Sequence, residues 1–264
     1  MTWADRHDAL GRAPMPSHCL PAGLSPPGVV VVAGPFGSGK TEIAVNLARR
    51  WAEAIPTYLA DLDVVTPYFR PRDIAQSLAT VGVRVLAPGG AAGAFDGPVL
   101  PREMAAAIGD TDSGLIIDVG GQPQGAGVLA HWREALQARG AKLCLVVNPR
   151  RPAGGNLGAL AELARAIVER AGLPIAGIIA NGNLGTRTTV ADVIEGLRKA
   201  RELAELLVVP VPVVCCPVEL TEECLVHVGD VPVFGLTLSM RPPWEGSGLS
   251  SWVGRCRSGF SRDP

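Results

Sequence analysis

The glycine-rich run from Gly34 to Thr41 has the residue types and the spacing of a loop that holds phosphates. It reads G-P-F-G-S-G-K-T, follows a run of valines, and leads directly into a stretch with helical periodicity. Gly37 and Gly39 let the backbone bend so that successive N–H groups turn toward an anion at the helix N-terminus. Lys40 can place its charge on the β- and γ-phosphates, and the Thr41 hydroxyl can bind Mg²⁺. The run predicts a nucleotide-binding loop, and a chance glycine-rich turn is the alternative.

Carboxylates follow two of the apolar runs, where such a loop would need them. Asp118 ends one run, and Asp61 and Asp63 end another. In open parallel sheets ligands gather at the carboxyl ends of the strands, so we expect Asp63 and Asp118 to join Thr41 around Mg²⁺. For Asp61, a contact to ribose or water, or a helix N-cap, is an equal alternative to catalysis.

No glutamate follows Asp118, so another residue must position the attacking water. Asp63 is the first candidate. Gln122 is the second, because it comes directly after Gly121, where Ras-like GTPases keep a water-orienting glutamine. Gly121 itself is expected to place its N–H on the γ-phosphate. A solvated loop amide is an equal alternative for Gln122.

The identity of the base is predicted from asparagine and lysine positions. The chain has only three lysines, and none stands in the Asn-Lys-x-Asp motif with which GTPases read guanine. Asn181 follows an apolar run, and its amide can both donate to and accept from adenine. We therefore expect ATP rather than GTP, with Asn181 as the base contact. A turn at Asn181-Gly182 is the alternative.

Between these residues, short apolar runs alternate with amphipathic stretches. Most of the runs are apolar throughout, which is typical of parallel strands covered on both faces. The alternation predicts an α/β fold: a doubly wound, mostly parallel sheet of about seven strands with helices on both faces. The expected strands are 29–33, 57–60, 83–87, 115–119, 143–147, 175–180 and 211–215, and the expected helices are 41–54, 71–80, 101–108, 126–139, 156–171 and 190–207.

Composition limits the organisation and the class of the protein. We expect one nucleotide-binding domain at 28–240, a poorly ordered extension at 1–27 and a poorly ordered tail at 241–264. With 24 basic and 25 acidic residues in a chain of 264, the basic face of a nucleic-acid-binding protein is not expected. The sequence has no membrane-length apolar stretch, no signal peptide and no disulfide framework, so we expect a cytoplasmic protein.

Taken together, these segments resemble the CobQ/CobB/MinD/ParA nucleotide-binding superfamily, in particular a poorly characterised bacterial branch with a D-L-D-x-V-x-P-Y-F-R segment. The resemblance spans roughly residues 29–215. It implies a P-loop NTPase fold like that of MinD and ParA, Mg²⁺-dependent ATP binding, slow hydrolysis and often a nucleotide-linked dimer. The residues that carry it are 34–42, 61–70, 118–121, 146–152 and 181–189.

One position departs from this resemblance. MinD- and ParA-type loops carry an additional lysine directly after the first glycine, and that lysine reaches the phosphates of a partner subunit. Pro35 stands there in this chain, so activation across a dimer by that lysine is not expected. Five loop arginines could act as an arginine finger instead, with simple solvation as the alternative: Arg70, Arg72, Arg150, Arg151 and Arg187.

The sequence predicts a Mg²⁺-dependent ATP-binding protein, a slow ATPase that acts as a nucleotide-driven switch on an unidentified protein partner, with a homodimer possible. One alternative is a kinase or a ligase of the cobyrinate or dethiobiotin type, with 89–101 as its lid. Others are a metal-centre maturation NTPase, suggested by Cys215 and Cys216, and a scaffold without hydrolysis. The expected catalytic residues are Lys40, Asp63, Asp118 and Gln122; the nucleotide contacts are Gly34, Pro35, Phe36, Gly37, Ser38, Gly39, Lys40, Thr41, Glu42, Gly121 and Asn181; the metal ligands are Thr41, Asp63 and Asp118.

Overall fold

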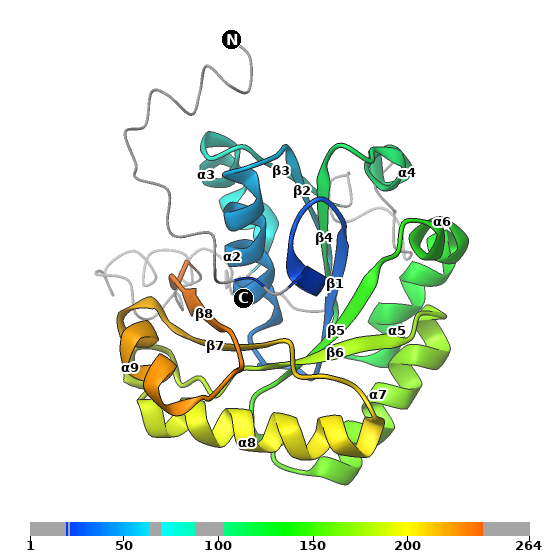
Figure 1. Cartoon of the computed structure of the whole chain (residues 1–264). Coiled ribbons are helices and arrows are strands. Elements are labelled where there is room, and N and C mark those ends of the chain that lie inside the picture. Colours follow the sequence, from blue (N-terminus) through cyan, green and yellow to red (C-terminus); the bar gives the residue numbers. More distant parts are fainter. Residues whose placement is uncertain (1–19, 21, 64–69, 88–102, 240–264) are drawn as a thin grey trace, which may run out of the picture.

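The computed structural model describes residues 20, 22–63, 70–87 and 103–239, and its centre is one parallel sheet (Figure 1). Its strands are β1 (Val29–Ala33), β2 (Thr57–Leu62), β3 (Val83–Leu86), β4 (Gly114–Val119), β5 (Lys142–Val147), β6 (Ile175–Ala180), β7 (Val213–Pro217) and β8 (Val233–Leu236). They lie in the order β3-β2-β4-β1-β5-β6-β7-β8, and every pairing is parallel. The chain winds from β1 to the β3 edge, returns to β4 and then crosses to β5. This order confirms the predicted doubly wound α/β fold.

Two details of the sheet differ from the expectation. The described part of the chain holds eight strands rather than about seven, because β8 adds to the β7 edge. This strand has only four residues and contains Gly235, so its pattern alone is weak. In addition, β2 continues to Leu62, which places Asp61 inside the strand, in register with Asp118 of β4.

Helices cover both faces of the sheet. They are α2 (Lys40–Ala52), α3 (Ala75–Thr80), α4 (Glu103–Gly109), α5 (Pro123–Ala126), α6 (Arg133–Ala138), α7 (Leu157–Ala171), α8 (Val190–Leu207) and α9 (Thr221–His227), with short 3₁₀ turns between several of them. The expected helix at 126–139 is instead split into α5, η5 (Gly127–Trp132) and α6. None of the helices in the described ranges combines the length and the apolar character that crossing a membrane requires.

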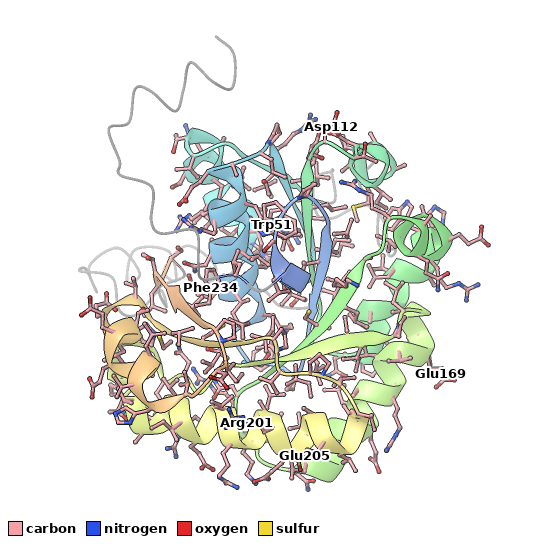
Figure 2. All side chains as sticks on the ribbon, in the orientation of Figure 1. Trp51, Asp112, Glu169, Arg201, Glu205 and Phe234 are labelled. Atoms are coloured by element: carbon pink, nitrogen blue, oxygen red, sulfur yellow. The ribbon has the colours of Figure 1, made fainter. Side chains whose placement is uncertain are left out.

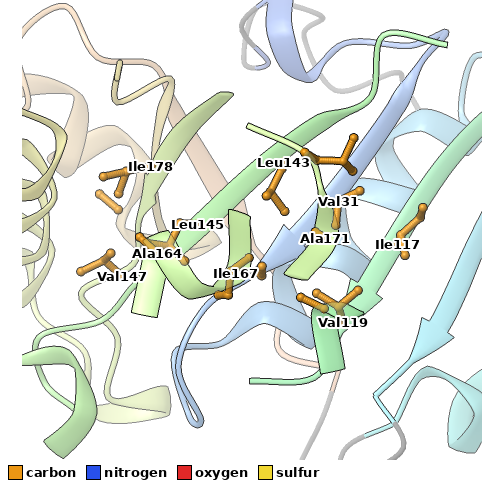
Figure 3. Close-up of a cluster of buried hydrophobic side chains, with 14 of the residues drawn as sticks. Val31, Ile117, Val119, Leu143, Leu145, Val147, Ala164, Ile167, Ala171 and Ile178 are labelled. Atoms are coloured by element: carbon orange, nitrogen blue, oxygen red, sulfur yellow. The ribbon is translucent and has the colours of Figure 1, made fainter. Parts of the chain in front are cut away.

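Alternation along the strands divides the core into two clusters. Val30 and Val32 pack with α2 and α3 on one face, and Val31 packs with α7 and α8 on the other. Figure 3 shows part of the second cluster, where Val31 and Ile167 are buried. Each such side chain contributes roughly 1.5–3 kcal/mol when it is fully buried. Two packed faces therefore hold the strand ends, where the site lies, in fixed positions.

Both ends of the described chain are tied to α2. Leu24 of η3 (Ala22–Leu24) is buried, and its carbonyl accepts a hydrogen bond from Trp51 Nε1 at 2.8 Å (Trp51 is labelled in Figure 2). After β8, the Thr237 N–H donates to Asn46 Oδ1 at 2.9 Å. Residues 22–27 of the expected extension thus include packed structure. Residues 1–19 and 21 of that extension and the expected tail at 241–264 lie outside the described residues.

Candidate functional site

The loop between β1 and α2 is bent by three glycines with positive φ. Gly34, Gly37 and Gly39 have φ of 144°, 75° and 94°. A β-carbon at Gly34 would lie 2.5 Å from the Val146 carbonyl oxygen, and one at Gly39 would lie 2.3 Å from Asn181 Nδ2. Both the conformation and the close packing therefore require glycine. The strand, the loop and the helix have the geometry of a P-loop.

Lys40 begins α2 and its ammonium lies within this loop. The side chain is buried, and Nζ donates to the Pro35 carbonyl at 3.3 Å. Burial lowers the pKa of Lys40, while the nearby Asp118 and Asp63 carboxylates act in the opposite direction. The lysine charge is therefore held between the loop and the two acids.

Thr41 and Asp118 meet at the ends of α2 and β4. Thr41 Oγ1 donates to Asp118 Oδ2 at 2.7 Å, and the Asp118 side chain is fully buried. Burial raises the pKa of Asp118 to about 7, against the lowering effects of Thr41 and Lys40. Its second oxygen, Oδ1, is buried without a hydrogen-bond partner in the described structure. Hydroxyl and carboxylate oxygens are ligands that Mg²⁺ prefers, so this pair fits the predicted magnesium site.

Asp61 lies beside Asp118 in the sheet, and its negative charge is compensated by Arg72. The sequence analysis proposed this arginine as a candidate arginine finger. Arg72 Nε donates to Asp61 Oδ2 at 2.7 Å, and Asp61 is fully buried. This hydrogen bond raises the pKa of Arg72. The same guanidinium donates to the Asp63 carbonyl at 3.2 Å. Asp61 is therefore the counter-ion of Arg72 at the base of the acidic group.

Asp63 is buried at the end of β2 and lies against the segment after β4. A β-carbon at Gly120 would be 3.3 Å from Asp63 Oδ1. Residues 64–69, which include the aromatic pair of the resembled segment, lie outside the described residues. The structure thus brings Asp63 together with Asp118 and Lys40, as expected of a shared site, and its catalytic role stays a prediction.

Gly121 lies directly on the phosphate loop. A β-carbon there would be 2.9 Å from the Phe36 backbone nitrogen and 3.2 Å from Lys40 Nζ. Gln122 precedes α5 as its N-cap residue and is exposed, with no capping hydrogen bond from its side chain. Its proposed role toward water stays a prediction. Phe36 is 69% exposed on the same loop.

On the other side of the loop, Asn181 acts as a brace. It is buried, and its Nδ2 donates to the Ser38 carbonyl at 2.7 Å. One donor of the amide is thus used on the loop, whereas Oδ1 is buried without a partner among the described residues. The contact of Asn181 with the base stays a prediction.

Asn148, at the end of β5, is a structural residue that the sequence analysis did not single out. Its Nδ2 donates to the Asn183 carbonyl at 2.9 Å, and its Oδ1 accepts from the Arg150 N–H at 3.0 Å. The side chain is buried and holds the loops after β5 and β6 together. An asparagine directly after an apolar run was the available signal.

Glu42 was expected to contact the nucleotide, and the structure places its carboxylate on the end of the described chain. Oε1 accepts from the Ser239 N–H at 2.6 Å and from Asn46 Nδ2 at 3.3 Å. These contacts join the first turns of α2 to the residues after β8. The contact between Glu42 and Ser239 links positions about 200 apart in sequence, so residue types alone could not reveal it.

The two adjacent cysteines on β7 point to opposite faces of the sheet. Cys215 packs in the α2 cluster and Cys216 in the α7 cluster, and both are fully buried. Burial raises the pKa of Cys216 to about 12. Over the described ranges, no group of three or more His, Cys, Asp or Glu side chains could hold a metal ion. The geometry gives no support to metal-centre maturation at these cysteines.

Comparison with known proteins returned structural similarities only. The structure of this chain is similar to that of FtsY from Mycoplasma mycoides (17% identity, TM-score 0.44, 70% of this chain and 58% of that one). It is also similar to FtsY from Thermotoga maritima (21%, 0.47, 80% and 67%) and to the 54 kDa signal recognition particle protein from Aeropyrum pernix (19%, 0.46, 79% and 45%). The chain thus spans about half to two thirds of the length of these proteins, and likeness at this level does not assign a function. No protein-family model and no curated protein matches the chain, so its resemblance to the CobQ/CobB/MinD/ParA superfamily stays a prediction.

Proposed function

We propose that this protein binds a nucleoside triphosphate with Mg²⁺ on the Gly34–Thr41 loop and hydrolyses it slowly, as a molecular switch. The observation that carries the proposal is the 2.7 Å contact between Thr41 and Asp118. It places the hydroxyl of the phosphate loop on a buried carboxylate at the end of a neighbouring strand. A glycine-rich turn with no ligand would have no reason to bury that carboxylate.

Each residue of the site has a role that follows from its position. Backbone N–H groups of the loop and the Lys40 ammonium bind the phosphates. Thr41, Asp118 and Asp63 supply the oxygens that hold Mg²⁺, which when bound neutralises charge on the phosphate oxygens. Asp63 or Gln122 orients the attacking water.

The switch follows from the junction of two strand ends. Asp63 after β2 lies close to Gly120 after β4, since a β-carbon at Gly120 would be 3.3 Å from Asp63 Oδ1, and Gly121 lies on the loop. A γ-phosphate at Lys40 would bind both segments, and its loss would release them. We propose that a protein partner binds one of these two states in preference to the other. A second copy of this chain is one candidate for that partner.

The preferred nucleotide is proposed to be ATP, because the chain lacks the guanine-reading Asn-Lys-x-Asp motif. The kinase or ligase alternative depends on segment 89–101, which lies outside the described residues, and no contact in the described part of the chain favours it.

Phosphate release from ATP and from GTP tests the proposal. Lys40→Ala and Asp63→Asn should each abolish turnover, because they remove the phosphate-binding charge and the carboxylate beside it. Lys142→Ala and Asp112→Asn are matched controls, since both residues are exposed and lie away from the loop (Asp112 is labelled in Figure 2). Turnover that is the same in all four variants would overturn the assignment, and turnover of GTP alone would reverse the base preference.

A further inference from the structure

The five candidate arginines differ in the partners of their guanidinium groups. Three are held by carboxylates: Arg72 by Asp61, Arg150 by Asp192, and Arg70 by Asp73. Arg187 is exposed in η7 (Gly185–Arg187). Arg151 is also exposed, and within the described ranges its side chain makes no hydrogen bond and no ion pair. Its charge is therefore available to a ligand.

Arg151 lies against the phosphate loop. A β-carbon placed on Gly37 would be 3.7 Å from both Cγ and Cδ of Arg151 and 4.0 Å from its Nε. These are ordinary contact distances, so three consecutive atoms of the side chain pass over Gly37. The guanidinium carbon is one bond beyond Nε. The charged group is thus carried to the loop where the phosphates of a nucleotide would lie.

The backbone that carries Arg151 is firmly held. The Arg151 N–H donates to the Asn148 carbonyl at 3.2 Å, and the Gly154 N–H donates to the Arg151 carbonyl at 2.8 Å. A β-carbon at Gly154 would lie 1.8 Å from the Asn148 oxygen, so the turn closes tightly. The neighbouring Arg150 is directed to Asp192 on α8 at 2.8 Å. The two adjacent side chains thus point in different directions, Arg150 toward Asp192 and Arg151 toward Gly37.

A polyphosphate bound at the loop would have too few positive side chains around it, among the described residues, to compensate its charge. Lys40 faces the carboxylates of Asp63 and Asp118, and it is the one charged residue in Gly34–Thr41. Arg72 is committed to Asp61. A polyphosphate brings several further negative charges to this loop. Guanidinium groups bind phosphate oxygens with two parallel hydrogen bonds, which suits an exposed arginine on a rigid turn.

We propose that Arg151 is a nucleotide-binding residue that contacts the polyphosphate from the β5 side of the loop, opposite Asp118. This inference rests on the proposed function. It assigns the second phosphate-binding cation to the same chain, so that a partner subunit is not needed to supply it.

The test is equilibrium binding of ATP and of inorganic tripolyphosphate to the full chain, both with Mg²⁺. Arg151→Ala should weaken the binding of both ligands about tenfold, which is the effect expected from the loss of a hydrogen bond to a charged group. Arg151→Lys should retain part of the affinity, because it keeps the charge but loses the planar fork. Arg150→Ala, the matched control, should leave both affinities within about twofold of the wild type. Unchanged thermal unfolding of Arg151→Ala would show that the loop is intact.

The outcomes separate the two levels of the account. If the wild-type protein and Arg151→Ala bind both ligands equally, the inference about Arg151 is wrong while the proposed function stands. Weaker binding of ATP but not of tripolyphosphate would place Arg151 on the nucleoside, which also contradicts the inference. If the wild type binds neither ligand, the proposed function and the inference are both overturned.

Discussion

The two sides of the phosphate loop are built from different chemistry. On the β4 and β2 side, Asp118, Asp61 and Asp63 are buried, and Lys40 and Arg72 lie among them. On the β5 and β6 side, the buried polar groups are neutral side-chain amides that hydrogen-bond to the backbone. Asn181 braces the loop, Asn148 joins the segments after β5 and β6, and the exposed Arg151 lies near Gly37 on the same side.

This difference separates ligand binding from support. Buried carboxylates are costly to ionise, which is shown by the raised pKa of Asp118, so they are retained where a cation will compensate them. Buried amides satisfy backbone groups at little cost and hold a loop in one shape. The acidic side is therefore expected to control the Mg²⁺-dependent part of the affinity, whereas variants of the amide side should act equally with and without Mg²⁺.

The largest expected effect is the loss of Mg²⁺-dependent affinity in Asp118→Asn. The amide is nearly isosteric but lacks the charge that holds the cation, so ATP binding with Mg²⁺ should weaken at least 100-fold, about 2.7 kcal/mol. Calorimetry with and without Mg²⁺ measures this. An equal weakening under both conditions would contradict the assignment of Asp118 to the metal.

Arg72→Ala should destabilise the acidic side by about 2 kcal/mol, because it leaves Asp61 buried and unpaired. Urea unfolding gives the value. The double variant Arg72→Ala with Asp61→Asn should recover most of the loss, since the uncompensated charge is then gone. If the double variant is as unstable as the single one, packing by Arg72 explains the effect and its charge does not.

The stability of the protein without Mg²⁺ or nucleotide should fall as the pH rises from about 4 to about 7. Folding raises the pKa of Asp118 from its ordinary value near 4 to about 7, so the folded state binds the extra proton in this window and loses it as the pH rises. Raising the pKa from near 4 to about 7 corresponds to a loss of up to about 4 kcal/mol, with a plateau above pH 7. Asp118→Asn should lack this fall in stability. The difference between the pH profiles of the wild type and the variant should therefore show it. Parallel profiles would refute the linkage.

Asn181→Ala should have the smallest effect, about 1 kcal/mol of stability, because it removes the hydrogen bond to the Ser38 carbonyl. ATP affinity should fall a few-fold to the same extent with and without Mg²⁺. A changed ratio of ATP to GTP affinity at unchanged stability would instead identify Asn181 as the base contact.

The periodicity of apolar residues predicted several helices and strands, some of them with their observed bounds. Strands β1 and β6 and helix α8 have the bounds expected from the residues, because a buried parallel strand and an amphipathic helix each have a distinct period. The helix expected at 126–139 is divided, and Gly127 lies at the division. Strand β8 was missed because it has only four residues and contains Gly235, so its apolar pattern is weak.

For the candidate site, the sequence predicted which residues gather at the strand ends but not how they pair. The contact of Thr41 with Asp118 follows from the topology once both motifs are placed. The pairing of Arg72 with Asp61 does not, because five loop arginines looked equivalent by type and position. Their separation depends on where the turns after β2 and β5 direct each side chain, which only the packed structure specifies.

The account is tested most directly by equilibrium binding of ATP and GTP with Mg²⁺ to the wild-type chain and to Lys40→Ala. We expect saturable binding of at least one nucleotide to the wild type, and at least 100-fold weaker binding to the variant, since Lys40 is the cation inside the loop. No saturable binding to the wild type, or equal binding to both proteins, would contradict the claim that this loop holds a nucleotide.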